Sequence, residues 1–182
     1  RGEFCNKAKD GSFYWVATSI VPFLDEKGNV YQYLSINQDI TRQKNAEYLI
    51  KEQAETFRAI IENTKESIYL LSPDFQLLQF NKTAKERILR ARNKELYLGA
   101  DFREFLFPET TDVFNSMFKD ALNGINRTEE VKALGENGEY IWFQSKTSPV
   151  YDTHGELIGV TLLAEGIDDR KKAEAVLRES EE

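Results

Sequence analysis

The sequence has very few of the residues that build metal centres and disulfide frameworks. Its 182 residues include one cysteine, Cys5, and one histidine, His154. A single cysteine excludes an intrachain disulfide and a zinc site made of several cysteines, and a single histidine excludes the HExxH motif of metalloproteases. We therefore expect a reducing, cytoplasmic setting. The chain starts at Arg1 and not at Met, so we treat it as part of a longer protein, which could carry a membrane anchor elsewhere.

Long apolar runs and an excess of positive charge are also absent. No stretch of the sequence approaches the roughly 18 uncharged apolar residues that a membrane span requires, and no signal peptide precedes the first strand-like segment. The net charge of −7 argues against binding to a phosphate backbone. We expect no nucleic-acid partner and no direct insertion into a membrane.

Catalytic motifs are missing too. The sequence has no GxGxxG, P-loop or GxSxG motif and no His/Cys pair, so we expect no catalytic activity within this chain. What it does have is enough apolar residues for a core, 41% of the total, of which many are aromatic. This composition excludes wholesale disorder.

An internal repeat organises the chain. Residues 10–16 read DGSFYWV and residues 137–143 read NGEYIWF, and the two segments align at an offset of 127 residues, as from Gly11 to Gly138. Further pairs keep this offset without a gap: Trp15 and Trp142, Pro22 and Pro149, Gly28 and Gly155, Ile40 and Ile167, Lys44 and Lys171, Glu47 and Glu174. Chance rarely keeps tryptophan, proline and glycine in register, so we infer the duplication of one supersecondary unit.

Each copy of the unit predicts a hairpin followed by a helix. Alternate residues form one face in 14–20 and in 141–147, which is the period of a half-buried strand. An Asp-x-x-Gly turn follows in each copy, and then a second strand and a helix that starts at Thr41 or Asp168. We expect a shorter strand to precede each hairpin.

Only the second copy has a full upstream half. Residues 67–80 predict another hairpin, and Asn81 can cap a helix from Lys82 to about Arg92. Apolar residues at i, i+4 spacing predict a second helix from about Glu109 to Asn123. Consecutive strands joined by tight turns imply an antiparallel sheet with the helices on one face, which is an α+β fold.

This order of elements resembles a PAS domain, and the repeat resembles its C-terminal, PAC-type segment. The most specific signature is Asp39-Ile40-Thr41 followed by Ala46-Glu47, which is similar to the DIT-x-x-x-x-AE ending that joins PAS domains to their output helices. The resemblance implies a five-stranded antiparallel sheet in the order 2-1-5-4-3, preceded by a partial second PAS sheet and a connecting helix. It divides the chain into a truncated PAS domain (1–42), a linker helix (43–64), a complete PAS domain (65–168) and the start of an output helix (169–182).

The second copy departs from this ending at two positions. Gly166 replaces the usual Asp and Asp168 replaces the usual Thr, and only the second replacement still supplies a helix cap. The resemblance implies that the endings couple each domain to the helix that follows it. The residues expected to carry this coupling are Asp39, Ile40, Thr41, Ile167 and Asp168.

PAS domains hold haem, a flavin or another small molecule between the sheet and the helices, or they act through partner contacts alone. We expect neither haem nor a flavin adduct, because the complete domain has no cysteine and His154 falls in a predicted hairpin turn. For an unidentified small organic ligand, the candidate pocket residues are Tyr69, Phe80, Asn81, Phe102, Phe114, Phe118, Phe143 and Ser145. The alternative, which is the more common one, is that these residues form a plain core with Asn81 as a helix cap.

Strand alternation places Trp142 on the outer face of the sheet. A tryptophan there needs a cover, and we expect the helix that precedes the domain to supply it. That helix, from about Thr41 to Asn63, carries an apolar stripe with the spacing of a coiled coil. The stripe consists of Ile50, Ala54, Phe57 and Ile61. We expect it to support a homodimer, and a solvated linker helix is the alternative.

These features favour a sensory module of a signalling protein over an enzyme. The resemblance implies the output of a sensor histidine kinase in a two-component phosphorelay, with a cyclic-di-GMP cyclase or phosphodiesterase as the alternative. A dimerisation and relay scaffold without a ligand also stays open. The expected partners are a second copy of the chain and a downstream output domain in the parent protein.

Overall fold

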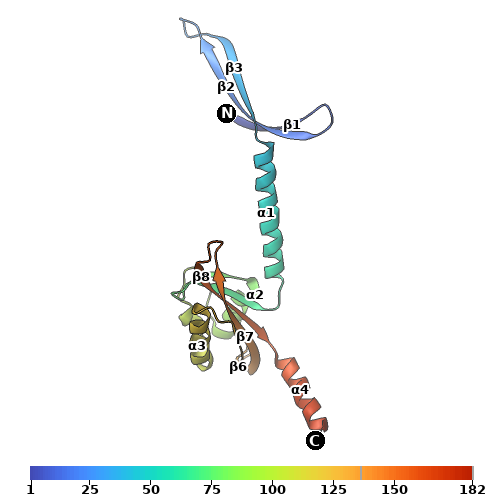
Figure 1. Ribbon diagram of the computed structural model, residues 1–182, viewed down its shortest axis with the longest axis vertical. Coiled ribbons are helices and arrows are strands. Elements are labelled where there is room, and N and C mark those ends of the chain that lie inside the picture. Colours follow the sequence, from blue (N-terminus) through green and yellow to red (C-terminus); the bar gives the residue numbers. More distant parts are fainter. Residues whose placement is uncertain (136, 182) are drawn as a thin grey trace. The chain divides into compact units, whose positions relative to one another are not determined.

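The computed structural model describes residues 1–135 and 137–181, and the chain forms two compact units, Arg1–Arg58 and Ala59–Glu182 (Figure 1). Glu182, the last residue of the predicted output helix, lies outside the described residues. The division falls inside helix α1 (Thr41–Glu62), which the sequence predicted as one separate linker. The last turn of α1 belongs to the second unit because it is hydrogen-bonded to that unit, as described below.

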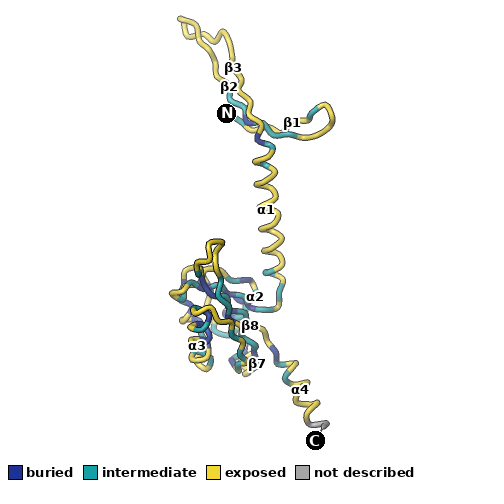
Figure 2. The backbone as a smooth tube through the Cα atoms, in the orientation of Figure 1, coloured by how far each residue is buried: buried dark blue, intermediate teal, exposed yellow. Residues whose placement is uncertain are grey.

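The first unit is a three-stranded antiparallel sheet with little core. Strands β1 (Gly2–Lys7), β2 (Phe13–Leu24) and β3 (Val30–Asp39) lie in that order, and α1 follows directly. Most of the residues in this sheet are exposed (Figure 2), including the apolar Ile20 and Tyr33. Among the described residues, no strand pairs with the outer edge of β3. The unit therefore presents an uncovered apolar sheet face.

The second unit contains the five-stranded antiparallel sheet that the resemblance implied. Its strands are β4 (Ser67–Leu71), β5 (Leu77–Phe80), β6 (Arg127–Leu134), β7 (Tyr140–Tyr151) and β8 (Leu157–Gly166). They lie in the order β5-β4-β8-β7-β6, which is 2-1-5-4-3 in chain order, so the predicted fold is confirmed.

Helices cover one face of this sheet. They are α2 (Lys82–Arg92), the 3-10 helices η1 (Phe102–Phe105) and η2 (Pro108–Thr110), and α3 (Thr111–Leu122). A last helix, α4 (Asp168–Glu181), follows β8 directly (Figure 1). The core lies between the sheet and the covering helices, where the largest fully buried side chains include Phe118, Leu71, Leu77, Met117 and Val160.

Matching turns join β2 to β3 and β7 to β8. In each turn the carboxylate of the aspartate, Asp25 or Asp152, accepts hydrogen bonds from two backbone N–H groups at 2.8 and 2.9 Å. Gly28 and Gly155 follow with φ of 81° and 85°, a conformation that glycine adopts without strain. His154 lies in the second turn with an exposed side chain, as the sequence predicted.

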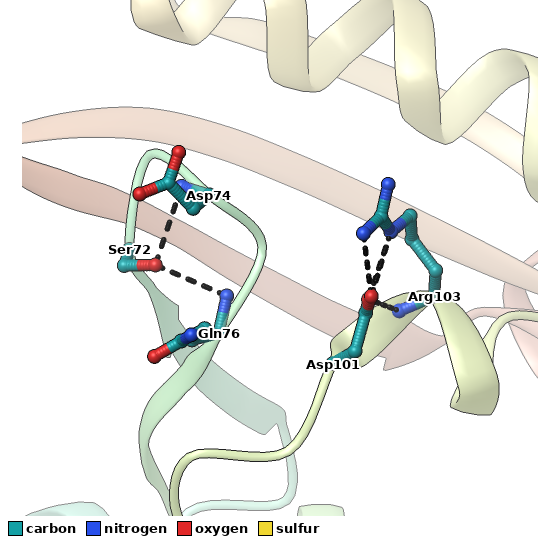
Figure 3. Close-up of polar contacts among 5 residues, drawn as sticks. All are labelled: Ser72, Asp74, Gln76, Asp101 and Arg103. Carbon is teal, nitrogen blue, oxygen red and sulfur yellow. Dashed lines mark hydrogen bonds and ion pairs between the residues drawn. The ribbon is translucent and has the colours of Figure 1, made fainter.

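The turn between β4 and β5 carries a strained aromatic residue. Phe75 has a φ of 67°, and this left-handed conformation costs about 1 kcal/mol or more for residues other than glycine. The Ser72 hydroxyl oxygen holds the turn by accepting hydrogen bonds from the N–H groups of Asp74 and Gln76 (Figure 3). The Phe75 ring stacks on Phe118 with the ring centroids 4.1 Å apart, a contact that offsets the strain.

Two strands of the second unit approach each other closely at a glycine. A Cβ atom at Gly159 in β8 would lie 2.3 Å from the carbonyl oxygen of Leu71 in β4. The position therefore excludes every residue with a side chain unless the backbone shifts.

Candidate functional site

The second unit has a partly open cavity of 60 Å³ between its sheet and its helices. Four of the predicted pocket residues line it: Tyr69, Phe102, Phe114 and Ser145. The ring centroids of Tyr69 and Phe102 are 4.9 Å apart, and those of Phe102 and Phe114 are 5.6 Å apart. The wall of the cavity is therefore largely apolar and aromatic.

The other four predicted pocket residues have different positions. Phe80 is half-buried at the end of β5 and packs against the core. Phe118 stacks on Phe75 within the core, and Asn81 caps α2. Phe143 lines a neighbouring hollow instead. The spacing of aromatic residues in the sequence thus indicated which residues are in the core. It did not distinguish the residues that line the cavity from those that only pack against other side chains.

Buried polar groups stand at the edge of the cavity. Tyr69 and Ser67 are 3% and 1% exposed, and their side chains are hydrogen-bonded to each other. Burial raises the pKa of the Tyr69 hydroxyl above its ordinary value, although the positive charge of Arg87 and the bond to Ser67 act in the opposite direction. The phenol is therefore neutral at physiological pH and serves as a hydrogen-bonding group.

Arg87 of α2 also lines the cavity, although the sequence pattern did not single it out. Its guanidinium carbon lies 3.6 Å from the ring centroid of Phe143, which is a cation–π contact. The sequence held a signal for this position. Arg87 follows Ala84 by three residues and precedes Ile88 by one, and both of these are buried. Helical periodicity therefore places Arg87 at the face of α2 that packs on the sheet.

A second, more polar hollow of 330 Å³ adjoins the cavity. Its described lining includes Lys65, Ser67, Thr83, Glu139 and Phe143. Arg87 and Ala164 line both hollows. Arg87 is therefore in contact with an apolar space on one side and a polar space on the other.

Asn81 connects α2 to the end of α1. Its side-chain oxygen accepts hydrogen bonds from the N–H groups of Ala84 at 3.0 Å and Ile68 at 3.1 Å. Its amide nitrogen donates to the carbonyl oxygens of Ile61 at 3.1 Å and Glu66 at 2.9 Å. Asn81 is 1% exposed, and we call these contacts the Asn81 network. Because α2 also forms part of the cavity wall, the network joins that wall to α1.

The first sheet is joined to its helix by what we call the upstream junction. The N–H of buried Ile40 donates to the carbonyl oxygen of Trp15 at 2.9 Å, and the Thr41 hydroxyl oxygen accepts from the Trp15 N–H at 2.9 Å. Lys44 of α1 forms an ion pair with Glu3 at 2.7 Å, and its ammonium nitrogen lies 5.7 Å from the Trp15 ring centroid. Backbone and side-chain contacts together fix the first turn of α1 against the sheet.

The second sheet is joined to α4 by a downstream junction that repeats these contacts. The N–H of Ile167 donates to the carbonyl oxygen of Trp142 at 2.8 Å. Lys171 pairs with Glu130 at 2.5 Å and lies 5.4 Å from the Trp142 ring centroid. The hydrogen bond from Lys172 lowers the pKa of Asp168 below its ordinary value, and the backbone N–H of Trp142 contributes in the same direction. The duplication seen in the sequence is thus preserved in individual contacts.

One side chain lies over the ring of Trp142. Trp142 does lie on the outer face, since its neighbour Phe143 points to the core. This side chain is that of Lys171 in the helix after the domain, and the cover by the helix before the domain stays a prediction. The backbone bond between Trp142 and Ile167 places the first turn of α4 beside the ring.

The departure at Gly166 also has a structural consequence. In the upstream junction the Asp39 carboxylate accepts a hydrogen bond from the N–H of Thr41 at 2.8 Å, and Gly166 has no side chain to repeat it. Asp168 instead forms an ion pair with Lys172 at 2.6 Å, within the first turn of α4. The first turn of each helix is thus stabilised by a different carboxylate.

The predicted stripe on α1 is largely exposed. Ile50 and Phe57 are 67% and 65% exposed, Ala54 is exposed, and Ile61 is half-buried. No described residue of α1 is buried. The stripe is therefore an apolar surface without a cover in the single chain. None of the described helices combines the length and the apolar character needed to cross a membrane.

Two protein families match separate parts of the chain. The family described as the PAS fold matches residues 61–172, which is more than half of the chain. The family described as the PAS domain matches residues 1–42. The first match contains the second sheet and the downstream junction, and the second contains the first sheet and the upstream junction up to Thr41.

Similar proteins of known name are signalling proteins. The chain is 30% identical over 151 residues to sporulation kinase E of Bacillus subtilis (strain 168), which covers 82% of this chain and 19% of that protein. It is 22% identical over 151 residues to the two-component sensor PprA of Pseudomonas aeruginosa, covering 82% of this chain and 16% of that protein. The chain thus spans less than a fifth of the length of these relatives.

A solved structure shows the same fold. The PAS domain of BvgS from Bordetella pertussis superposes with a TM-score of 0.51 at 20% identity, and the match covers 71% of this chain and 97% of that chain. The likeness extends over nearly all of that domain, as expected for a complete copy of the fold in the second unit.

Proposed function

Because the chain belongs to the PAS domain family, we propose that it senses a small molecule in its interior cavity and relays the occupancy to an output domain of a longer signalling protein. The observation that carries this proposal is the Asn81 network. It joins α2, which forms part of the cavity wall, to the last turn of α1. A ligand that moves α2 therefore acts directly on the backbone of the connecting helix.

The strands supply a second route, toward α4. Ser145 in β7 and Ala164 in β8 both line the cavity. The same two strands lead to Trp142 and Ile167, whose backbone bond starts the downstream junction. A change in the spacing of β7 and β8 thus reaches the first turn of α4 within a few residues.

The proposed output is that of a sensor histidine kinase. Its support is the similarity to a protein named sporulation kinase and to one named two-component sensor. The helix after the downstream junction would carry the signal to the kinase part of the parent protein. We further propose that two copies associate through the exposed stripe on α1, because burying apolar side chains such as Ile50 and Phe57 is favourable.

We propose an organic ligand and neither haem nor flavin. The side chain of His154 is in an exposed turn, and Cys5 is exposed on β1 in the first unit. Neither residue lines the cavity. The aromatic and aliphatic wall suits an apolar portion of a small molecule instead.

Filling the cavity tests the relay. The variant Ala164→Leu adds three carbon atoms at the wall, and Ala175→Leu on the exposed face of α4 is the matched control. We expect Ala164→Leu to change the hydrogen-exchange rates of the Thr64 and Ile167 amides by at least about fivefold. A fivefold change corresponds to the lower end of typical coupling free energies between two sites. Exchange equal to wild type at both amides would refute the relay.

A ligand-free relay scaffold is the second candidate, and the small volume of the cavity favours it. Mass spectrometry of small molecules released from the protein as purified separates the two. A stoichiometric compound supports the sensor, whereas repeated absence of any compound together with a dimer through α1 supports the scaffold.

A further inference from the structure

The duplication of the chain singles out one hydroxyl group in the cavity of the second unit. Ser145 in β7 pairs with Ala164 in β8, and both residues line the cavity. At the offset of 127 residues their counterparts in the first sheet are Thr18 and Asn37, which pair in the same register. The Thr18 hydroxyl donates a hydrogen bond to Asn37 Oδ1 at 2.7 Å. Ala164 has no polar side chain, so this bond is not repeated at Ser145.

The Ser145 hydroxyl can therefore serve a molecule in the cavity, since a serine hydroxyl both donates and accepts hydrogen bonds. Two other hydroxyl groups of the described lining have partners within the protein. The Thr110 hydroxyl donates to the carbonyl oxygen of Phe107 at 3.1 Å, and the Tyr69 hydroxyl is hydrogen-bonded to Ser67. We therefore assign the polar contact of a ligand to Ser145.

The aromatic part of the wall favours a planar ring. The ring centroid of Phe102 lies 4.9 Å from that of Tyr69, 5.6 Å from that of Phe114 and 6.4 Å from that of Phe105. All four residues line the cavity. Aromatic rings attract a further ring in offset or edge-to-face arrangements, with centroids roughly 4.5–7 Å apart. An aromatic ring in the cavity would therefore gain contacts that a saturated ring does not.

The volume of the cavity limits the ligand to a single ring. A water-sized group needs roughly 10–15 Å³ of such volume, so the 60 Å³ cavity holds roughly four to six such groups. The atoms of a ring are covalently bonded and lie closer together than separate water molecules do. One ring of five or six atoms therefore fits, whereas a fused ring system would extend out of the cavity.

A charged group suits this cavity poorly. Apolar side chains such as Met117, Val131 and Leu162 make up most of the described lining, and they cannot replace the hydration shell of an ion. Arg87 also lines the cavity, but its guanidinium carbon lies 3.6 Å from the ring centroid of Phe143, so this cation is engaged within the protein. We therefore expect an uncharged ring.

We propose that the ligand is an uncharged aromatic molecule of a single ring with one hydrogen-bonding substituent, and that this substituent bonds to the Ser145 hydroxyl. The ring lies beside Phe102 and Phe114. The inference rests on the proposed function, because it names the ligand class of the same cavity. It also makes Ser145 the residue that selects this class.

Four probes of similar size test the ring, the substituent and the charge. We would titrate the whole chain with phenol, toluene, cyclohexanol and benzoate and follow the backbone amide signals of Ser145 and Ala164 by NMR. We expect phenol to bind about three- to tenfold more tightly than cyclohexanol, because only phenol stacks on the aromatic wall. We expect benzoate to bind at least about tenfold more weakly than phenol. Cyclohexanol or benzoate bound as tightly as phenol would overturn the proposal.

Variants of Ser145 locate the substituent. Ser145→Ala is expected to weaken phenol about three- to tenfold, as the loss of one hydrogen bond between neutral groups does, and to leave toluene unchanged. Ser145→Thr keeps the hydroxyl, as Thr18 does in the first copy, and should retain the wild-type ratio of the two affinities. The matched control is Ser148→Ala, on the opposite face of the same strand, which should bind phenol like wild type.

Two results would refute the role of Ser145. Equal weakening of phenol and toluene by Ser145→Ala would show that the side chain only maintains the structure. Unchanged phenol binding in this variant would show that the substituent bonds elsewhere.

The outcomes distinguish this inference from the proposed function. If a compound of another class is released from the purified protein and none of the four probes binds, the ligand class is wrong while the sensor stands. If phenol binds with the expected selectivity but neither phenol nor Ala164→Leu changes hydrogen exchange at the Thr64 and Ile167 amides, the ligand class is supported and the relay fails.

Discussion

The Asn81 network offers a direct test of how the second unit is held together. In the variant Asn81→Ala, α2 loses the side-chain cap at Ala84, which is worth about 0.5–2 kcal/mol. The N–H of Ile68 also loses its bond to that side chain at a partly buried position, at a cost of about 1–3 kcal/mol. We therefore expect the free energy of unfolding of the second unit to fall by about 1.5–5 kcal/mol.

Urea denaturation measures this loss if the signal comes from the second unit alone. The chain has two tryptophans, so the background Trp15→Phe leaves Trp142 as the fluorescent reporter of the second unit. The matched control is Asn123→Ala, because the exposed Asn123 side chain donates to a single carbonyl oxygen. We expect this control to stay within about 0.5 kcal/mol of the background. A loss below about 1 kcal/mol in Asn81→Ala would refute the reasoning.

The variant Asn81→Asp separates the two roles of the side chain. Aspartate keeps the acceptor for Ala84, and its charge suits the start of a helix. It has no amide donor for the carbonyl oxygens of Ile61 and Glu66. We expect faster hydrogen exchange at the Thr64 amide and retained protection at the Ala84 amide. Loss of protection at both amides would show that the two roles are not separable.

Further predictions concern the sheet, the junctions and the helix stripe. Gly159→Ala should lower the free energy of unfolding by about 1–3 kcal/mol, as overpacking does, and unchanged urea midpoints would refute the close approach. Lys171 of the downstream junction and the neighbouring Arg170 hold the pKa of Glu130 below its ordinary value of 4.5. These contacts with the Glu130 carboxylate therefore stabilise the fold at neutral pH, and the stabilisation is lost as the pH falls through the lowered value. Wild type and Glu130→Gln should therefore converge in stability as the pH falls from 4.5 through the lowered value, and a gap that persists below that lowered value would contradict this. Ile50→Glu with Phe57→Glu should weaken the dimer at least about tenfold in sedimentation equilibrium, since each buried apolar side chain contributes about 1.5–3 kcal/mol, and an unaltered equilibrium would exclude the stripe. The purified protein should show no haem or flavin absorbance, and a Soret band lost in His154→Ala would overturn this.

The fold was largely predictable because its signals are local. Asn81 marks the start of α2 through its own side chain, and the offset of 127 residues between Gly11 and Gly138 revealed both hairpins. These features depend on residues that are close in sequence or repeated at a constant distance. The sequence pattern alone was therefore sufficient to place the strands and the turns.

The contacts between distant elements were not predictable in the same way. Alternation gave the face on which Trp142 lies, but it could not show that Lys171 covers the ring. That contact depends on the pairing of β6 with β7, which brings Glu130 beside the start of α4. Arg87 was not predicted for a similar reason. The spacing of apolar residues in α2 does not show that a cation of this helix packs on Phe143 in another element.

The repeated junctions have a consequence for the spacing of modules along a chain. Each junction bonds the backbone at the start of a helix to its own sheet, through Ile40 in the first copy and Ile167 in the second. Each helix therefore starts at a fixed rotation about its own axis relative to the sheet before it. Every further helical residue lies about 100° further around that axis. Adding one residue within an ideal α-helix shifts every later side chain by about 100° around the helix axis, whereas adding seven returns them to within about 20° of their original positions around it. A linker helix that starts at such a junction can thus change length in steps of a heptad and keep its apolar stripe on nearly the same side of the helix.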